Sequence, residues 1–201
     1  MNNHKKTLDA SYFNALYGNN QDPWNFEGSD YEKNKYAQTM LMIPDDVYAR
    51  VFEIGCSNGV LTEMLQNRSQ RLLAVDSSRV AVENAKKRLE KYHHVIVVEM
   101  EVPREFPALK FNLILLSEVG YFMVAEELLA LRDKLIAALL PGGHLLMVHW
   151  TPVVEEFPLT GDQVHEFFIE ESDESGPLDH LKNRKEPEYR MDLFKRKPVP
   201  A

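Results

Sequence analysis

Short apolar runs alternate with segments of helical period along most of this chain. Five runs carry apolar side chains at largely consecutive positions: 50–54, 71–76, 93–100, 111–119 and 144–150. The segments at 60–68, 78–92 and 123–140 have the apolar spacing of helices. Apolar residues at consecutive positions are typical of parallel strands that helices cover on both faces. The pattern therefore predicts an α/β fold whose central sheet is parallel.

The last third of the chain departs from this alternation. A proline-containing connection leads to a short amphipathic segment at 163–171. Two further runs, 178–183 and 188–196, are then separated only by the charged turn RKEP. So short a connection cannot hold a crossover helix, so these runs predict an antiparallel hairpin at the edge of the sheet.

Length and charge restrict the class of protein. With 201 residues, the chain is long enough for one well-covered core and short for two ordinary domains. A net charge of −8 argues against nucleic acid as the main partner, because binding to a phosphate backbone needs many Lys and Arg contacts. The N-terminus lacks the apolar stretch of a signal peptide, and no segment of membrane-spanning length is free of charge. We expect a soluble, cytoplasmic protein with a small-molecule ligand and no membrane partner.

The cysteine and histidine content gives little sign of a metal. Cys56 is the single cysteine, which excludes an internal disulfide and a multi-cysteine zinc site. We interpret it as a small buried apolar residue. The seven histidines follow no recognisable ligand spacing, so no structural metal is predicted.

The stretch VFEIGCSNG, residues 51–59, lies at the first turn from strand to helix, where open parallel sheets bind ligands. A dinucleotide fingerprint, G-x-G-x-x-G from Gly55, would need glycine at two positions that hold Ser57 and Val60. An acidic residue two before the first glycine and a second glycine four after it are present, as Glu53 and Gly59. Glycine permits a backbone turn closed to other residues and a close approach by a ligand. The spacing disfavours a pyrophosphate and leaves an adenosyl ligand as the alternative.

Asp76 ends the second apolar run, 17 residues beyond Gly59. A carboxylate there can accept hydrogen bonds from both hydroxyls of a ribose, in NAD or in an adenosyl sulfonium. The competing interpretation is a helix cap. Together with the upstream Glu and Gly residues, ribose binding is the favoured role.

These motifs resemble those of the class I methyltransferases that use S-adenosylmethionine. EIGCSNG resembles their first motif, AVDSS the acid after their second strand, and FNLILLSEVGYF and LLPGGHLLMVHW their fourth and fifth strands. Ser57 replaces the usual middle glycine. The resemblance implies a Rossmann-like, seven-stranded, mostly parallel sheet with a C-terminal antiparallel hairpin and an N-terminal helical cap. We expect one domain, 1–201, made of a cap (1–45), a cofactor-binding core (49–151), and a substrate-side insertion with the hairpin (152–201).

The resemblance also implies roles at the cofactor, with S-adenosylhomocysteine as the product. Glu53 would hold the amino group of the methionine part through water or the backbone, and Gly55 and Gly59 would line the sulfonium and ribose. Asp76 would bind the ribose hydroxyls. The remaining implied cofactor contacts are Ser77 beside the adenine, Glu101 at its amino group, the Val102 N–H at a ring nitrogen, and Ser117. Glu101 competes for its role with Glu99 and Glu105, and an ordinary loop charge is the alternative.

A finer resemblance lies in the segment before the first strand. It is similar to the N-terminal cap of the NodS-type N-methyltransferases, which methylate the free amine of a deacetylated glucosamine in an oligosaccharide. The stretch HWTPVVEEFPLTGDQVHE also resembles relatives associated with sugar deacetylases. By this resemblance Trp24 or Tyr31 would cover the sulfonium by cation–π contact and Lys35 would meet the cofactor carboxylate. Packing of an aromatic N-terminal helix is the alternative. The residues that match are Asp22, Pro23, Trp24, Tyr31, Glu32 and Lys35.

Methyl transfer to an amine needs a neutral lone pair aligned with the carbon–sulfur bond, so a group that accepts the amine's proton should face the methyl. Glu118 and His149 follow the fourth run and end the fifth, and are the candidate catalytic residues. His149 would be a base and Glu118 would orient the amine or neutralise its charge. A satisfied strand-end histidine and a helix-start charge at Asp162 are the alternatives. The candidate substrate-side residues are Tyr121, Trp150, Asp162 and His165.

Three classes of function follow. The first is an N-methyltransferase for a small amine, including an amino sugar, with a methyltransferase for another O or N acceptor as its variant. The second is an NAD-dependent oxidoreductase, disfavoured by Ser57 and Val60. The third is a non-catalytic module that binds an adenosyl cofactor. The sequence leaves open the acceptor, the acceptor atom, the base and the oligomeric state.

Overall fold

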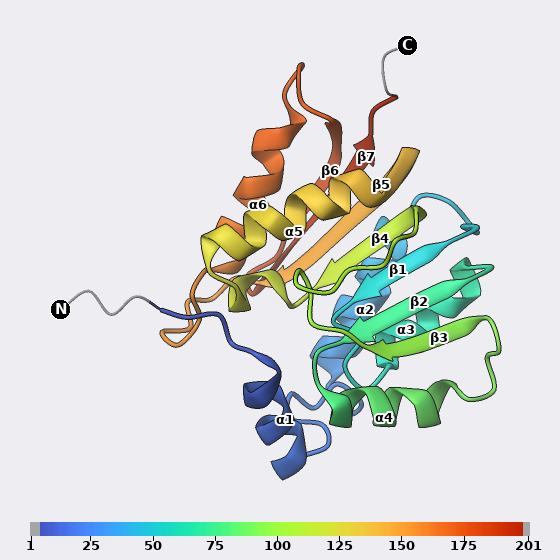
Figure 1. Ribbon diagram of the computed structural model, residues 1–201, viewed down its shortest axis with the longest axis vertical. Helices are drawn as coiled ribbons and strands as arrows, with labels where there is room; N and C mark the ends of the chain where they lie inside the picture. The colour runs from blue at the N-terminus through green and yellow to red at the C-terminus, as the bar shows by residue number, and fades with distance from the viewer. Residues whose placement is uncertain (1–4, 199–201) are drawn as a thin grey trace.

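The computed structural model describes residues 5–198 and forms a three-layer α/β structure around a seven-stranded sheet (Figure 1). The strand order is β3-β2-β1-β4-β5-β7-β6, in which β7 is antiparallel to both β5 and β6 and the other pairs are parallel. The predicted mixed sheet and C-terminal hairpin are therefore confirmed. The strands are β1 (Val51–Ile54), β2 (Leu72–Asp76), β3 (Val95–Glu99), β4 (Phe111–Ser117), β5 (Leu139–Trp150), β6 (Leu178–Lys185) and β7 (Tyr189–Arg196).

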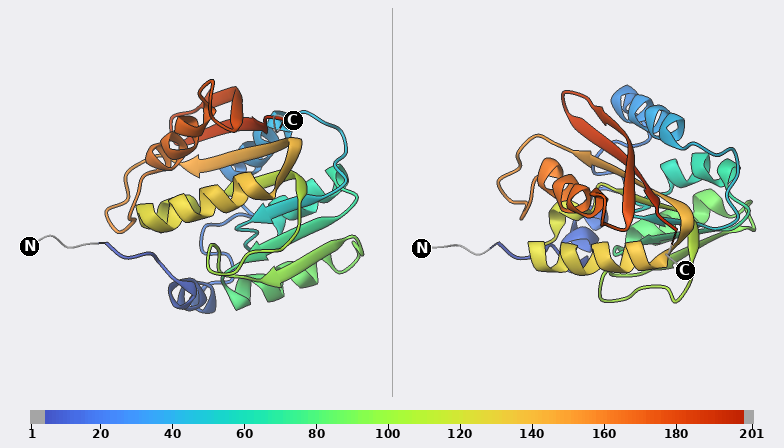
Figure 2. Two further views of the ribbon diagram at one scale, coloured as in Figure 1. Left: turned by 45° about the horizontal axis from the view of Figure 1, so that its top comes forward. Right: turned by 90° about the horizontal axis from the view of Figure 1, so that it is seen from above.

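Helices cover both faces of the sheet, which explains the consecutive apolar residues of the strands. In β4, Ile114 and Leu116 are buried on the side of α5 and α6, whereas Leu113 and Leu115 are buried on the side of α2 and α3. Figure 2 shows these two helix layers on opposite sides of the sheet. The helices are α1 (Ala10–Asn19), α2 (Asp30–Met42), α3 (Val60–Leu65), α4 (Arg79–Leu89), α5 (Ala125–Ala138) and α6 (Gly161–Ile169). Short 3-10 turns are η1 (Gln66–Arg68), η2 (Gly120–Phe122) and η3 (Glu170–Ser172).

Side-chain caps set the first turns of the helices near the carboxyl edge of the sheet. The Ser78 hydroxyl accepts the N–H of Ala81, so Ser78 is the N-cap of α4. Thr160 and Gln163 form a reciprocal capping box at the start of α6. These caps hold α4 and α6 at fixed places beside the loops that follow β2 and β5.

The start of β5 differs from the sequence-based expectation. The sequence pattern placed the helix at 123–140 and the next strand at 144–150, but α5 ends at Ala138 and β5 begins at Leu139, before the glycines of LLPGGH. Leu139 pairs with Phe111, and the register then shifts before His144 pairs with Leu113. The glycines form this irregularity, with Gly142 at φ +79°. Pairing with β4 therefore starts the strand earlier than residue 144.

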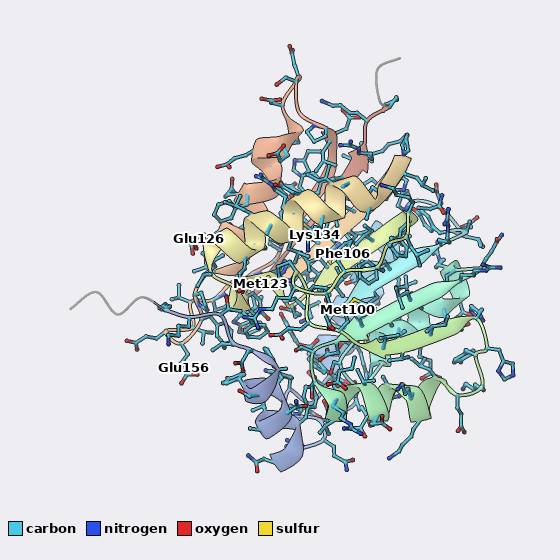
Figure 3. The ribbon with its side chains drawn as sticks, in the orientation of Figure 1. Met100, Phe106, Met123, Glu126, Lys134 and Glu156 are labelled. Atoms are coloured by element: carbon cyan, nitrogen blue, oxygen red, sulfur yellow. The ribbon has the colours of Figure 1, made fainter. Side chains whose placement is uncertain are left out.

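A loop, not a helix, covers the sheet between β3 and β4. Phe106 packs edge-on against Phe52 of β1, with ring centroids 5.7 Å apart. Lys134 of α5 donates to the Pro103 carbonyl at 2.6 Å, and Figure 3 shows Lys134 and Phe106 side by side. Met100 lies past the end of β3 and Met123 past η2 in the same view. The loop is thus fixed to α5 while its first residues stay at the carboxyl edge of the sheet.

Within residues 5–198, no helix is both long enough and apolar enough to cross a membrane.

Gly59 gives a test of the packing between α3 and α4. It caps α3 at φ +81°, and a Cβ there would lie 3.2 Å from the Cα and Cβ of Ala85 in α4. We expect Gly59→Ala to lower the free energy of unfolding by about 2–3 kcal/mol in guanidinium titrations, because left-handed backbone and overpacking both cost stability. The control is Gly18→Ala in α1, where nothing lies within 4 Å of the new methyl group. That change should be neutral or stabilising, and equal losses in both variants would contradict the account.

Candidate active site

A cavity of about 490 Å³ lies at the carboxyl ends of β1, β2 and β4, where the strand order reverses. The loops after β1 to β5 form its floor and walls. The N-terminal cap closes it from above, through residues that include Leu8, Phe13, Tyr17 and Trp24. This is the location at which open parallel sheets bind ligands.

The glycine turn after β1 is left-handed at three alternate positions. Gly55, Ser57 and Gly59 have φ of +82°, +50° and +81°. A Cβ on Gly55 would lie 2.7 Å from the Ser117 carbonyl oxygen, so only glycine fits between the cavity and β4. Ser57 occupies the place of the usual middle glycine, and its hydroxyl hydrogen bonds with the Tyr17 hydroxyl of α1. The departure from the family motif is therefore also a link between the turn and the cap.

Gly59 does not have the place that the resemblance implied. It was expected to line the sulfonium and ribose, but it is absent from the cavity wall and faces Ala85 and Leu89 of α4. The left-handed N-cap of α3 directs this residue towards the neighbouring helix. Its lack of a side chain serves helix packing.

Asp76 lies in the cavity wall at the end of β2. The Ser57 N–H donates to Oδ2 and the Ser78 N–H donates to Oδ1, both at 2.9 Å. Burial raises the pKa of Asp76, and the backbone donors offset part of that rise. Each carboxylate oxygen keeps a further lone pair for a ligand hydroxyl. Ser77, next in the chain, also lines the cavity.

Glu53 lies behind the turn, fully buried and outside the cavity wall. Its Oε2 has no hydrogen-bond partner among residues 5–198. Burial raises the pKa of Glu53 to about 7, with a smaller opposing effect of Thr62 and a contribution from Asp76. A buried carboxylate with an orphaned oxygen beside a ligand turn is the group expected to meet a cation directly or through water.

Glu101 and Val102 line the cavity at the end of β3, as the resemblance implied, whereas Glu105 turns back and accepts the Glu101 N–H at 3.0 Å. Arg104 pairs with Glu101 at 3.5 Å and with Glu127 of α5 at 3.6 Å. The predicted residue Ser117 also lies in the wall, at the end of β4. The charged side chains in this part of the wall are therefore mainly acidic.

A buried cluster of charges joins the cap to the loop after β4. Lys35 of α2 lies 2.7 Å from Glu118 Oε1 and 3.0 Å from Glu32. The two carboxylates raise the pKa of Lys35 against the opposing effect of burial. The Lys35 ammonium, expected at a cofactor carboxylate, is thus already held by two protein carboxylates. It also lies 5.4 Å from the centre of the Tyr31 ring.

Glu118 has every oxygen engaged. Lys35 donates to Oε1. Oε2 accepts hydrogen bonds from the Tyr121 hydroxyl at 2.7 Å and from the backbone N–H of Trp150 at 2.8 Å. Its backbone has φ +57°. These contacts make Glu118 the group that orients Tyr121 and the end of β5. Its Oε1 keeps one lone pair, so the predicted role of Glu118 at the amine stays a prediction.

Aromatic side chains form the rest of the wall. Tyr121 stacks on Phe157 with an interplanar angle of 4°, and Tyr31 packs edge-on against Trp150. Trp24 stacks on Phe26. The predicted residues Trp24, Tyr31, Tyr121 and Trp150 all line the cavity. Sequence reasoning missed Phe13, Tyr17, Phe122 and Phe157, of which the first two have the i, i+4 spacing of one helix face.

Three further predicted residues, besides Glu53 and Gly59, do not line the cavity. His149 is completely buried, its Nε2 accepts the Gly120 N–H at 3.2 Å, and its Nδ1 lies 3.0 Å from His165 Nε2. His165 is also buried and bonded to Asp192, while Asp162 pairs with Lys185 and Arg190 of the hairpin. These contacts contradict the expectation that His149 is the base and that His165 and Asp162 contact the acceptor. On a strand, neighbouring side chains face opposite sides, so Trp150 faces the cavity and His149 does not.

The residues present fit an adenosyl cofactor. Gly55, Asp76, Ser77, Glu101 and Val102 share one cavity, and the orphaned Glu53 oxygen lies beside the same turn. Cys56 is buried, and burial raises the pKa of its thiol well above the ordinary range, as expected for an inert residue. Within residues 5–198 no group of three or more His, Cys, Asp or Glu side chains is arranged to hold a metal ion.

Comparison with known proteins gives a consistent family. The family model described as Nodulation protein S (NodS) matches residues 16–149. Nodulation protein S of Rhizobium tropici is 33% identical over 128 residues, which cover 62% of this chain and 53% of that protein. That of Bradyrhizobium diazoefficiens is 34% identical, covering 62% of this chain and 61% of that protein. The chain thus spans little more than half the length of the curated relatives it matches.

Solved structures agree. A crystal structure from Pseudomonas syringae, described as a candidate methyltransferase, is 36% identical with a TM-score of 0.72 and covers 83% of this chain and 99% of that one. The N-methyltransferase NodS of Bradyrhizobium japonicum WM9, in complex with S-adenosyl-L-homocysteine, has the same fold with a TM-score of 0.79 at 20% identity, covering 94% of this chain and 99% of that one. Because the family model spans more than half of the chain, the protein belongs to the nodulation protein S family.

Proposed function

We propose that the protein is an S-adenosylmethionine-dependent N-methyltransferase that methylates a small-molecule amine. The observation that carries the proposal is a single cavity with two chemically different halves. One half holds the left-handed glycine turn and Asp76, and the other holds Glu118, Tyr121 and Trp150. Membership of the NodS family supports the same activity.

The first half binds the cofactor. Asp76 accepts hydrogen bonds from the ribose hydroxyls, Gly55 gives the ligand close access to the end of β1, and Glu53 balances the charge of the cofactor's amino group. The Glu101 carboxylate and the Val102 N–H face the adenine edge. When bound, the cofactor supplies an activated methyl group on a sulfonium, so the protein must mainly position the acceptor and exclude water.

The charge of the cavity favours a cationic acceptor. Its wall has five acidic side chains, Glu32, Asp76, Glu101, Glu118 and Glu127, against two basic ones, Lys35 and Arg104. An excess of carboxylates attracts amines and repels phosphorylated or carboxylated acceptors. This supports an amine over other methyl acceptors.

Tyr121 is the residue proposed to contact the reacting amine. Its hydroxyl donates to Glu118 Oε2 at 2.7 Å, so the lone pairs of Oη remain to accept an amine N–H. Burial and the Glu118 charge raise the pKa of Tyr121 well above its ordinary value, so the phenol stays protonated. The amine enters as an ammonium ion and releases its proton to solvent at the cavity, and Tyr121 then orients the neutral amine.

The finer proposal is that the acceptor is the free amine of a deacetylated amino sugar or chitooligosaccharide. Its supports are the family and the flat aromatic surface of Tyr121 and Phe157 at the acceptor side. Aromatic rings of this kind also pack against other small amines. Transfer of a labelled methyl group to glucosamine oligomers but not to their acetylated forms would support the sugar, and transfer only to hydroxyl or carboxyl groups would contradict an amine acceptor.

Asp76→Asn tests cofactor binding. The amide keeps an oxygen for one backbone N–H but cannot accept both ribose hydroxyls. Calorimetry should show S-adenosylmethionine affinity reduced roughly tenfold or more, because a charged hydrogen bond is lost. Asp30→Asn, at a fully exposed position of α2, is the control and should bind as the unmodified protein does. Unchanged affinity in the Asp76 variant would overturn the assignment.

Tyr121→Phe tests whether Tyr121 acts in catalysis and not in cofactor binding. We expect kcat for an amine to fall by roughly 10- to 100-fold while cofactor affinity stays the same, since the lost hydroxyl contacts Glu118 and the acceptor but not the cofactor. Tyr92→Phe, whose hydroxyl meets Glu63 away from the cavity, is the matched control. If the unmodified protein binds the cofactor but methylates none of the amines tested, the protein is a cofactor-binding module and the proposal fails.

Glu53→Gln tests the buried carboxyl through pH. The pKa of Glu53 is raised to about 7 in the folded state. The stability that its neutral form contributes is therefore fully present below the unfolded pKa of about 4.5 and is lost as pH rises through 7. Relative to the unmodified protein, the free energy of unfolding of the variant should rise by on the order of 3 kcal/mol from about pH 4.5 to pH 8.5. Denaturant unfolding of the apo protein measures this difference. Glu83→Gln on the surface of α4 should show no such gain. A pH-independent difference for Glu53→Gln would refute the shifted pKa.

A further inference from the structure

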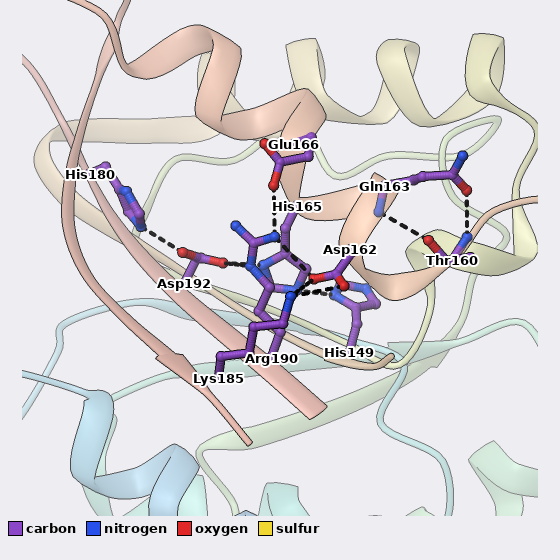
Figure 4. Close-up of polar contacts among 10 residues, drawn as sticks. All are labelled: His149, Thr160, Asp162, Gln163, His165, Glu166, His180, Lys185, Arg190 and Asp192. Atoms are coloured by element: carbon purple, nitrogen blue, oxygen red, sulfur yellow. Dashed lines mark hydrogen bonds and ion pairs between the residues drawn. The ribbon is translucent and has the colours of Figure 1, made fainter. Parts of the chain in front are cut away.

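A continuous chain of hydrogen bonds runs from the acceptor-side turn η2 to the C-terminal hairpin. The Gly120 N–H meets His149 Nε2 at 3.2 Å, His149 Nδ1 meets His165 Nε2 at 3.0 Å, and His165 Nδ1 meets Asp192 Oδ2 at 2.6 Å. Figure 4 shows the two imidazoles and Asp192 with the charged side chains around them. Five elements, η2, β5, α6, β7 and β6, contribute to this chain and its end.

The first donor fixes the direction of every bond that follows. A backbone N–H can only donate, so His149 Nε2 carries no proton. A neutral His149 then carries its proton on Nδ1 and donates to His165 Nε2. His165 in turn carries its proton on Nδ1 and donates to Asp192. One tautomer of each ring satisfies all three bonds.

Both rings are held in the neutral state. They are completely buried, and burial lowers the pKa of His149 well below its ordinary value and also lowers the pKa of His165 against the opposing effect of Asp192. A second proton on His149 would face the Gly120 N–H, donor against donor. Besides His165, the charged group that acts on His149 is Lys35, which also disfavours a second proton.

The far end of the chain is neutralised at the hairpin. Arg190 Nε donates to Asp192 Oδ2 at 2.7 Å, and His180 Nε2 lies 2.6 Å from Asp192 Oδ1. Arg190 also pairs with Asp162 and Glu166 of α6, and Lys185 pairs with Asp162. The buried Asp192 carboxylate is therefore fully bonded and balanced, which a buried charge requires.

The near end of the chain meets the groups of the proposed reaction. Gly120 lies between Glu118 and Tyr121, and a Cβ on it would lie 3.2 Å from His149 Nε2 and closer still to Val164. The Tyr121 ring packs edge-on against His149 with centroids 5.5 Å apart. The Tyr121 carbonyl accepts the Leu159 N–H at 3.2 Å, so the same turn also holds the loop before α6.

We propose that His149 and His165 are positioning residues for the acceptor site: two neutral, Nδ1-protonated imidazoles that hold the Gly120 backbone and thereby fix the Tyr121 hydroxyl against Glu118. The catalytic part of this inference rests on the proposed function, whereas the tautomers and the restraint on Gly120 do not. His149 touches neither acceptor nor cofactor and transfers no proton.

Nitrogen-15 NMR on the unmodified protein tests the tautomers. Both rings should show a protonated Nδ1 and an unprotonated Nε2, and the signals should not titrate between about pH 8 and pH 6. The Gly120 amide should exchange slowly with solvent. An Nε2-protonated His149, or a ring that titrates near its ordinary pKa of about 6.5, would overturn the proposal whether or not the protein transfers methyl groups.

Two variants of His149 test the positioning. In His149→Gln the amide oxygen accepts the Gly120 N–H and the amide nitrogen donates to His165, whereas His149→Leu leaves both groups unpaired. We expect His149→Leu to lose the slow exchange of Gly120 and to lower kcat by roughly tenfold or more with cofactor affinity unchanged. His149→Gln should keep slow exchange and restore kcat to within a few-fold, although glutamine cannot act as a base.

His93→Gln, outside the chain of bonds, is the control and should leave both readouts unchanged. If His149→Gln is as inactive as His149→Leu while Gly120 remains protected, His149 acts as a base and the proposal fails. If neither variant changes kcat or Gly120 exchange, the chain restrains nothing and the proposal also fails. If no amine is methylated by the unmodified protein, the proposed function fails, and Gly120 exchange alone then decides the restraint.

Discussion

The carboxylate of Glu118 joins the parts of the molecule that form the cavity. It accepts the Lys35 ammonium from the cap, the Tyr121 hydroxyl from the turn after β4, and the Trp150 N–H from the end of β5. Without Glu118, Lys35 would lose one of its two buried counter-charges and Tyr121 its hydrogen-bond partner. Breaking a buried pair on one side is costly because the remaining charge is left uncompensated. The cap, the turn after β4 and the sheet edge are therefore linked at one point.

Two polar networks meet at the turn that carries Glu118 and Tyr121. On the cavity side the Lys35–Glu118 pair sets the side chains, and on the opposite side the histidine chain holds the Gly120 backbone. The C-terminal hairpin thus supports a site that it does not line. Under the proposed function, this support from behind keeps the acceptor-side residues within the narrow geometry that methyl transfer requires.

The sequence was sufficient for the architecture and for part of the cavity wall. Consecutive apolar residues predicted the strands, and Gly55 and Asp76 marked the turn and the wall. It misplaced His149 because the end of a strand indicates an edge of the sheet but not a face. Trp150, one residue on, lies in the wall instead. The sequence misplaced Asp162 and His165 because the hairpin, whose charged side chains hold both residues of α6, lies far away in sequence. The Lys35–Glu118 pair joins residues 83 positions apart, and the role of Gly59 depends on the approach of α4, so neither could be read from local spacing.

The proposed function depends most on an adenosyl cofactor that lies between Asp76 and Tyr121. The direct measurement is a crystal structure of the protein with S-adenosylhomocysteine. We expect both ribose hydroxyls at the Asp76 carboxylate, the sulfur directed towards the Tyr121 hydroxyl, and the Lys35–Glu118 pair intact. A cofactor bound elsewhere, or one whose ribose makes no contact with Asp76, would contradict the account.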